Sequence, residues 1–126
     1  MALGKKIGEF SFTSTGVTLS ENANGGWVSA VNYEGTASDY GTVIGTLTLN
    51  IPAVGAKSGT SQWRGQGFLP SGEVVVGTAQ GVWHEAGKHQ WRVRGINAVS
   101  NGAVFANDGV IDLASRTYKG TLLAWD

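Results

Sequence analysis

A strand–turn–strand pattern that occurs twice in succession between residues 62 and 113 constrains the fold more than any other feature of the chain. Each copy begins with Gln-Trp-Arg, at Gln62–Arg64 and at Gln90–Arg92, and continues through a glycine-containing turn into an apolar strand. Gly81 and Gly109 lie at equivalent positions in the two copies. Consecutive hairpins of this kind predict an antiparallel meander.

The rest of the chain shows the same strand-and-turn pattern, and no window keeps the apolar period of a long helix. The expected strands cover residues 7–13 (continuing to 19 after a bulge at Gly16), 27–36, 40–51, 62–69, 73–83, 90–99, 103–111 and 116–125. A count of 20 glycines with only 2 prolines fits many strands joined by tight turns. The longest break, residues 52–59, is expected to be a plain connection, with a mobile lid as the alternative.

Eight strands in this order indicate an all-β fold, in which residues 1–126 form a single antiparallel, mostly up-and-down eight-stranded β-barrel. An open sheet of this width would leave two edges and one apolar face exposed, whereas closure removes the edges. The alternative is a two-sheet sandwich, which is disfavoured because the sequence lacks the long crossovers of a Greek key. A barrel of eight strands is either filled by side chains or holds one small ligand.

The composition argues against several classes of function. Charged residues make up 14% of the chain and the formal net charge is zero, so the basic surface that nucleic-acid binding requires is missing. The absence of cysteine removes disulfides, thiolate nucleophiles and cysteine metal sites. The N-terminal residues do not resemble a signal peptide, and no segment reaches the roughly 18 apolar residues of a membrane span. We therefore expect a soluble cytoplasmic protein with neither nucleic-acid nor membrane partners.

The arginines decide which face of the repeated strands points inward. Arg64, Arg92 and Arg94 share one phase, and burying them unpaired would cost on the order of several kcal/mol per ion, so we expect them to point outward. The alternative places these arginines inside, around a carboxylate or phosphate. The resulting interior set comprises Phe10, Phe12, Trp27, Val31, Tyr33, Val43, Leu47, Leu49, Trp63, Gly65, Gly67, Leu69, His89, Trp91, Val93, Gly95, Asn97 and Val99.

Five residues of this interior set are candidates for lining a ligand site, namely Tyr33, Trp63, His89, Trp91 and Asn97. A buried Asn97 must be hydrogen-bonded and could orient a ligand carbonyl, although capping a bulge or binding a core water is the commoner role. The tryptophans are more simply explained as large residues that fill the middle of a small all-β domain.

Motifs for catalysis or cofactor binding are not evident, so catalytic residues stay unassigned and no cofactor or metal is expected. His84 and His89 flank a turn that contains Glu85, but this spacing is not a zinc signature. No serine lies in a nucleophile-elbow context, and no glycine-rich segment leads into the helix start that a phosphate loop needs. The carboxylates show no spacing typical of a paired general acid and base.

The segment from Glu73 to Trp83 is apolar on both faces. Its two phases are Val74, Val76 and Val82 on one side and Val75, Ala79 and Trp83 on the other. A barrel strand without a polar outer face must be covered by an irregular segment or by a second subunit. This pattern favours a homo-oligomer that associates through Glu73–Trp83.

Three segments resemble the allene oxide cyclase-like β-barrels, namely Gly41–Leu47 (Gly-Thr-Val-Ile-Gly-Thr-Leu), Gly59–Gly67 and Asp108–Leu113. The likeness covers most of the chain as a layout of strands. It implies a barrel that binds an apolar small molecule in its interior, a cofactor-free cyclase or isomerase reaction in some members, and frequent oligomerisation. No catalytic residue can be matched, so no catalytic role carries over.

The leading interpretation is a barrel whose apolar, tryptophan-lined interior binds a hydrophobic small molecule, with a cofactor-free cyclase or isomerase that steers its substrate as the catalytic form. The alternatives are a non-enzymatic, lipocalin-like carrier and a structural or carbohydrate-binding β module. An enzyme predicts a cavity with at least one buried polar group, and a carrier predicts an open and almost entirely apolar cavity. The third class predicts a filled barrel with Trp63, Trp83 or Trp125 exposed.

Overall fold

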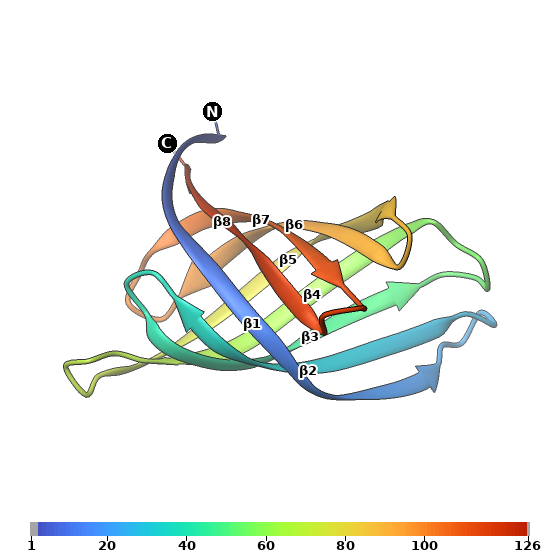
Figure 1. Cartoon of the computed structure of the whole chain (residues 1–126), viewed down its shortest axis with the longest axis horizontal. Helices are drawn as coiled ribbons and strands as arrows, with labels where there is room; N and C mark the ends of the chain where they lie inside the picture. Colours follow the sequence, from blue (N-terminus) through green and yellow to red (C-terminus); the bar gives the residue numbers. More distant parts are fainter. Residues whose placement is uncertain (1–2, 126) are drawn as a thin grey trace.

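The computed structural model describes residues 3–125, which form a closed barrel of eight antiparallel strands (Figure 1). Each strand pairs with its neighbours in the sequence, and the first strand closes the barrel against the last. The strands are β1 (Leu3–Glu21), β2 (Trp27–Ala37), β3 (Gly41–Ile51), β4 (Ser58–Phe68), β5 (Val74–Gly87), β6 (Gln90–Val99), β7 (Val104–Asp112) and β8 (Thr117–Trp125). The predicted all-β, eight-stranded up-and-down barrel is confirmed, and the sandwich alternative is wrong.

Three strands are longer than the sequence pattern predicts. β1 runs for 19 residues, and the predicted bulge is present as a register shift between Ser14 and Gly16. β4 begins at Ser58 and β5 continues to Gly87, because the two strands stay paired past the predicted hairpin, with Ser58 opposite His84. Small and polar residues are weak strand formers, so a pattern of apolar residues underestimates strand ends that are held by pairing.

The core fills the barrel with alternate residues of the strands, as the pleat of a sheet requires. Its buried members are Phe10, Phe12, Tyr33, Val43, Leu47, Leu49, Trp83, Val93, Phe105, Ile111, Tyr118 and Leu122. Most of the predicted interior positions are therefore confirmed. The interior position predicted for Trp27 is wrong. Trp27 is 38% exposed, because it is the first residue of β2 and lies beyond the packed layer.

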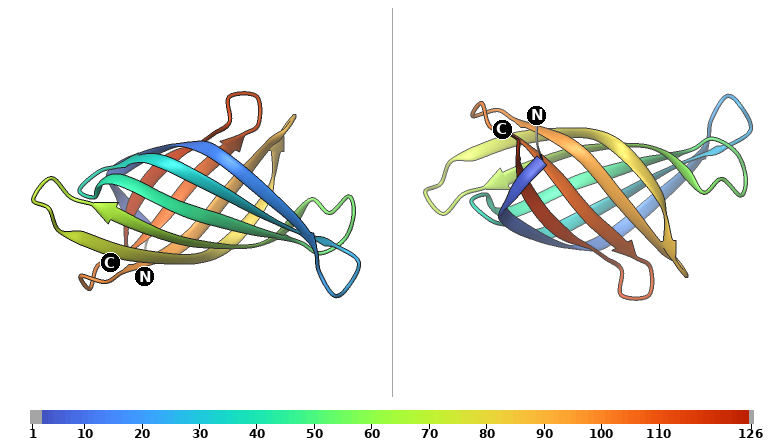
Figure 2. Two further views of the ribbon diagram at one scale, coloured as in Figure 1. Left: turned by 90° about the horizontal axis from the view of Figure 1, so that it is seen from below. Right: turned by 90° about the horizontal axis from the view of Figure 1, so that it is seen from above.

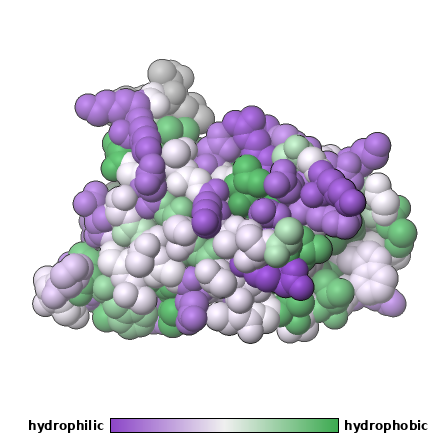
Figure 3. All heavy atoms as spheres, viewed as in Figure 1, coloured by the Kyte–Doolittle hydropathy of each residue, from purple (hydrophilic) through white to green (hydrophobic). Residues whose placement is uncertain are grey.

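The arginines lie on the outside of the barrel, so the alternative that places them in the interior is wrong. Arg64 and Arg94 are exposed, and Arg92 forms a bidentate ion pair with Asp108 across β6 and β7. The distances are 2.9 Å from Arg92 Nε to Oδ1 and 2.5 Å from Nη2 to Oδ2. Hydrogen bonding to Arg92 lowers the pKa of Asp108 below its ordinary value. Hydrophilic side chains are interspersed with hydrophobic ones on the face shown in Figure 3.

Two inward glycines at equivalent positions of the repeated hairpins allow other groups to approach the strands closely. A Cβ atom on Gly81 would lie 2.0 Å from the backbone oxygen of Arg94, on the neighbouring strand. A Cβ atom on Gly109 would lie 2.7 Å from Cζ of Phe10 and 2.8 Å from Cε1 of Tyr118. The repeat thus keeps glycine where the backbone or an aromatic ring occupies the space of a side chain.

The two ends of the barrel carry different connections (Figure 2). The end that we call the terminal end contains Leu3 and Trp125, which pair with each other, together with the turns β2–β3, β4–β5 and β6–β7. The opposite end contains the turns β1–β2, β3–β4, β5–β6 and β7–β8. Near the opposite end the buried ring of Trp83 donates from Nε1 to the backbone oxygen of Asn50 at 2.9 Å, which fixes the orientation of the indole there.

Candidate functional site

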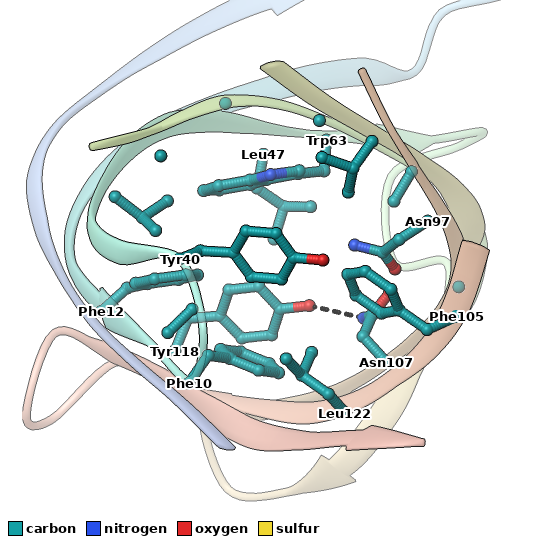
Figure 4. A pocket seen from close by; sticks show the side chains of 18 of the residues that line it. Phe10, Phe12, Tyr40, Leu47, Trp63, Asn97, Phe105, Asn107, Tyr118 and Leu122 are labelled. Atoms are coloured by element: carbon teal, nitrogen blue, oxygen red, sulfur yellow. Dashed lines mark hydrogen bonds between the residues drawn. The ribbon is translucent and has the colours of Figure 1, made fainter. Parts of the chain in front are cut away.

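The interior of the barrel contains a cavity of about 80 Å³ (Figure 4). This volume has room for about five water molecules, and it is well below the roughly 300 Å³ at which typical ligand pockets begin. Large rings and small residues share its wall. The aromatic part comprises Phe10, Phe12, Tyr40, Trp63, Phe105 and Tyr118, and the small part includes Gly65, Gly67, Gly77, Ala79 and Gly95.

The cavity exists because glycines of β4, β5 and β6 face inward where other strands place side chains. Gly65 and Gly77 lie directly opposite each other in adjacent strands. A Cβ atom on Gly77 would meet nothing closer than Val99 Cγ2 at 3.8 Å, so the space beside it is open. Gly65 differs, because the indole of Trp63 already occupies its side-chain space, with Cζ2 at 2.8 Å from an ideal Cβ.

Stacked aromatic pairs hold the rings around the cavity in fixed orientations. Phe12 and Trp63 are almost parallel, with ring centroids 5.3 Å apart and an interplanar angle of 2°. Tyr40 and Phe105 stack at 5.8 Å and 26°. Pairs of this geometry stabilise one another by about 0.5–1.5 kcal/mol beyond simple burial. The cavity is therefore bounded by flat, preorganised apolar surfaces.

A cluster of polar groups lies among these rings. Asn107 is buried and donates from Nδ2 to the Tyr118 hydroxyl oxygen at 3.1 Å. The Oδ1 atoms of Asn97 and Asn107 are shielded from solvent and have no hydrogen-bond partner within the described residues. Gly95 leaves room for Asn107, because a Cβ atom there would lie 3.2 Å from Asn107 Oδ1. Buried polar atoms are rarely left without partners in proteins, so these two oxygens mark where a ligand or a bound water could donate a hydrogen bond.

The cavity is uncharged. None of the residues that line it is an Asp, Glu, Lys, Arg or His. Burial raises the pKa of the Tyr118 phenol far above its ordinary value and raises that of Tyr33 to about 12, so both phenols are neutral at physiological pH. The site can therefore donate and accept hydrogen bonds, but near neutral pH these tyrosines supply no charged base or nucleophile.

The structure brings two of the five predicted ligand residues, Trp63 and Asn97, to the cavity wall. Tyr33 is buried and packs beside Tyr118 with ring centroids 5.6 Å apart, but it does not line the cavity. Trp91 is half-buried and packs against the core away from the cavity. The interior position predicted for His89 is wrong. His89 is exposed, and its φ of 54° places it in the turn that precedes β6.

Asn107 and Tyr118 are two polar residues of the site that the sequence interpretation missed, and the half-buried Tyr40 and the buried Ser61 also line the cavity. Asn107 shares the inward phase of Phe105 and Gly109 in β7, and Tyr118 has the same phase as Leu122 in β8. Extending the parity argument to the last two strands would have placed both residues inside. Their contact itself depends on the register between β7 and β8, which carries no local sequence signal.

Other kinds of site are not evident among the described residues. No three His, Asp or Glu side chains of residues 3–125 are grouped so that they could hold a metal ion. The Nδ1 atom of His84 lies 2.9 Å from the backbone oxygen of Glu85 in the neighbourhood of the β5–β6 turn. Within the same range, none of the chain forms a helix that is long and apolar enough to cross a membrane.

Comparison of this chain with protein-family models, with curated proteins and with solved structures found no match. The resemblance to allene oxide cyclase-like barrels therefore stays a prediction. The cavity and its side chains are the features that bear on function.

Proposed function

We propose that the protein binds a small, neutral and mostly apolar molecule inside the barrel. The observation that carries the proposal is the combination of an aromatic-walled cavity with two buried amide oxygens, on Asn97 and Asn107, that lack partners. Leaving a buried acceptor without a donor costs about 1–3 kcal/mol, and a ligand or bound water that supplies a donor would recover that cost. Apolar walls with a few convergent polar groups are the usual composition of a ligand site.

The cavity volume limits the size of the ligand. A cavity of about 80 Å³ is smaller than the roughly 150 Å³ cavity that binds benzene in another protein, so a single ring is the largest ligand that it can take and lining side chains must move outward to admit it. A larger molecule would have to displace Tyr40, whose half-buried ring stacks on Phe105 where the cavity approaches the terminal end. We therefore narrow the predicted hydrophobic ligand to a molecule of about one ring.

A cofactor-free reaction in the cavity would extend this binding function to catalysis. An enzyme was expected to have a buried polar group in its cavity, and Asn97, Asn107 and Tyr118 fit that expectation. Such a cyclase or isomerase would act by holding its substrate in a reactive shape, because the lining groups are uncharged. A plain carrier would use the same cavity without turnover. A filled structural or carbohydrate-binding module predicts that Trp63, Trp83 or Trp125 is exposed, and Trp125 is 39% exposed. We favour interior binding over that alternative because Trp83 is buried, Trp63 faces the cavity and the barrel is not solidly filled.

Filling the cavity tests the proposal. We expect toluene, added to the folded protein and followed by two-dimensional NMR, to shift the Trp63 indole and the Asn97 side-chain amide. Gly77→Val should abolish these shifts, because the added side chain enters open space in the cavity. Thr78→Val is the matched control, since Thr78 is exposed on the other face of the same strand. Shifts confined to surface residues, or equal binding by Gly77→Val, would reject interior binding.

We further propose that the protein forms a homo-oligomer through β5. Val74, Val76 and Val82 are each about half exposed on the outer face of this strand, and the exposed Phe68 lies directly opposite Val74 in β4. The inward residue Val75, by contrast, is buried in the barrel. A substitution that tests the outer face must therefore be made at Val74, Val76 or Val82, and Val75→Lys would damage the core instead.

Val76→Lys is expected to convert an oligomer into monomers, because it places a charge in the proposed apolar interface beside Val74 and Phe68. Native mass spectrometry and sedimentation velocity measure the change. Thr18→Lys adds the same charge to an exposed position of β1, which is not adjacent to β5 in the barrel, and is expected to leave the oligomer intact. If wild-type protein is monomeric, or if the Val76→Lys oligomer persists, this interface does not exist.

A further inference from the structure

We propose that the ligand presents a neighbouring hydrogen-bond donor and acceptor on a neutral ring, and that the carboxamide of Asn97 recognises both. A cyclic amide such as 2-pyridone has this chemistry. The inference rests on the proposed function, since it requires the cavity to bind a molecule. Binding in the interior does not by itself say which residue recognises the ligand, and here that residue is Asn97.

The carboxamide of Asn97 is free to pair with such a group. Its Oδ1 is shielded and has no partner within the described residues, and its nitrogen points toward the middle of the cavity in Figure 4. A carboxamide carries a donor and an acceptor side by side. A ligand amide can therefore accept from Nδ2. It can also donate to Oδ1 once the Asn97 side chain rotates to bring that shielded oxygen to the cavity surface.

Asn107 supplies a second acceptor on the same wall. Asn107 pairs with Leu122 in β8 and lies opposite Gly95 in β6, two residues before Asn97, so the two asparagines are diagonal inward neighbours. Its Nδ2 is engaged by the Tyr118 hydroxyl at 3.1 Å, which leaves Oδ1 beside the side-chain-free Gly95. Tyr118 is thus a positioning residue that fixes which atom of the Asn107 amide remains available.

The remaining walls determine the rest of the ligand. The parallel rings of Phe12 and Trp63 and the stacked rings of Tyr40 and Phe105 offer flat apolar faces. A planar ring can stack on such faces. No charged side chain lines the cavity, so a carboxylate or an ammonium group would be buried without a partner. A neutral planar ring that carries an amide satisfies all of these conditions.

The test compares 2-pyridone with toluene, which has the same ring size and number of non-hydrogen atoms but neither donor nor acceptor. Dissociation constants of both probes are measured by NMR titration for wild type and for Asn97→Leu, which keeps a side chain of similar size. We expect Asn97→Leu to weaken 2-pyridone binding about tenfold relative to toluene. The quantity compared between wild type and Asn97→Leu is the ratio of the two dissociation constants. The hydration free energy of each probe is the same for both proteins, so it cancels in this comparison, as in a double-mutant cycle.

The outcomes separate the two proposals. If neither probe binds wild type, interior binding and this inference both fail. If toluene binds but the ratio is the same in wild type and Asn97→Leu, interior binding stands and recognition by Asn97 is wrong. Gly77→Val should block both probes when they occupy the cavity.

Tyr118→Phe provides an independent readout, also usable if Asn97→Leu does not fold. Removing the hydroxyl releases the Asn107 amide without changing the ring that packs against Phe10. We expect a several-fold loss of 2-pyridone affinity with toluene affinity unchanged. An equal loss for both probes would indicate a purely structural role for Tyr118, and no change for either would exclude Asn107 from recognition.

Discussion

Gly81→Ala is expected to lower the free energy of unfolding by about 3 kcal/mol, the upper part of the range for overpacked interiors. The added Cβ atom would lie 2.0 Å from the backbone oxygen of Arg94 and 2.6 Å from Cα of Gly95. Both atoms belong to the main chain of β6, so no side-chain rotation relieves the clash and the two strands must separate. Urea denaturation followed by circular dichroism measures the loss.

Gly77→Ala is the matched control for this substitution. It makes the same chemical change on the same inward face of β5, but its Cβ atom meets only Val99 Cγ2 at 3.8 Å and Ala98 O at 3.9 Å. Alanine also restricts the unfolded chain more than glycine does. Gly77→Ala should therefore be neutral or slightly stabilising. Equal effects of the two substitutions would show that the approach of β6 to Gly81 does not limit packing.

Leu47→Ala is expected to destabilise the protein by about 2–5 kcal/mol, the range for truncating a buried leucine. Leu47 is 1% exposed and lines the cavity, so the lost methyl groups would enlarge an existing space that the surrounding rings cannot close. Thermal and urea unfolding measure the change. Ile44→Ala on the exposed face of the same strand should cost much less.

The enlarged cavity of Leu47→Ala gives a second readout. Apolar cavities of this kind bind small apolar molecules, and binding to the folded state raises its stability. Saturating toluene should therefore restore more stability to Leu47→Ala than to wild type. If toluene stabilises neither protein, the cavity beside Leu47 is not accessible to ligands.

Strand parity was predictable because charged residues cannot be buried without partners. Arg64 and Arg92 alternate with Trp63 and Trp91, and this contrast orients both repeated strands correctly. At strand ends the alternation stops, and charge no longer predicts which way a side chain points. His89 has the right spacing to be interior, but it adopts a left-handed conformation in the turn and points away from the core.

The cavity itself could not be predicted from the sequence. Its size depends on how the Trp63 ring lies over Gly45 and Gly65, where ideal Cβ atoms would be 2.5 Å and 2.8 Å from ring carbon Cζ2. A different rotamer of that ring would change how much of the interior is filled. The contact between Asn107 and Tyr118 likewise depends on the register of two strands, and alternation alone predicts only that both residues face inward.

The closure of the barrel between β1 and β8 has a consequence for how the chain folds. Every other strand pair joins neighbours in the sequence and can form as a hairpin. The pairing of Leu3 with Trp125 joins nearly the whole length of the chain, and the entropy cost of closing a loop grows with its length. The pairing of β1 with β8 therefore joins the residues that are farthest apart in the sequence. Until this pairing forms, the meander exposes two unpaired edges to other chains.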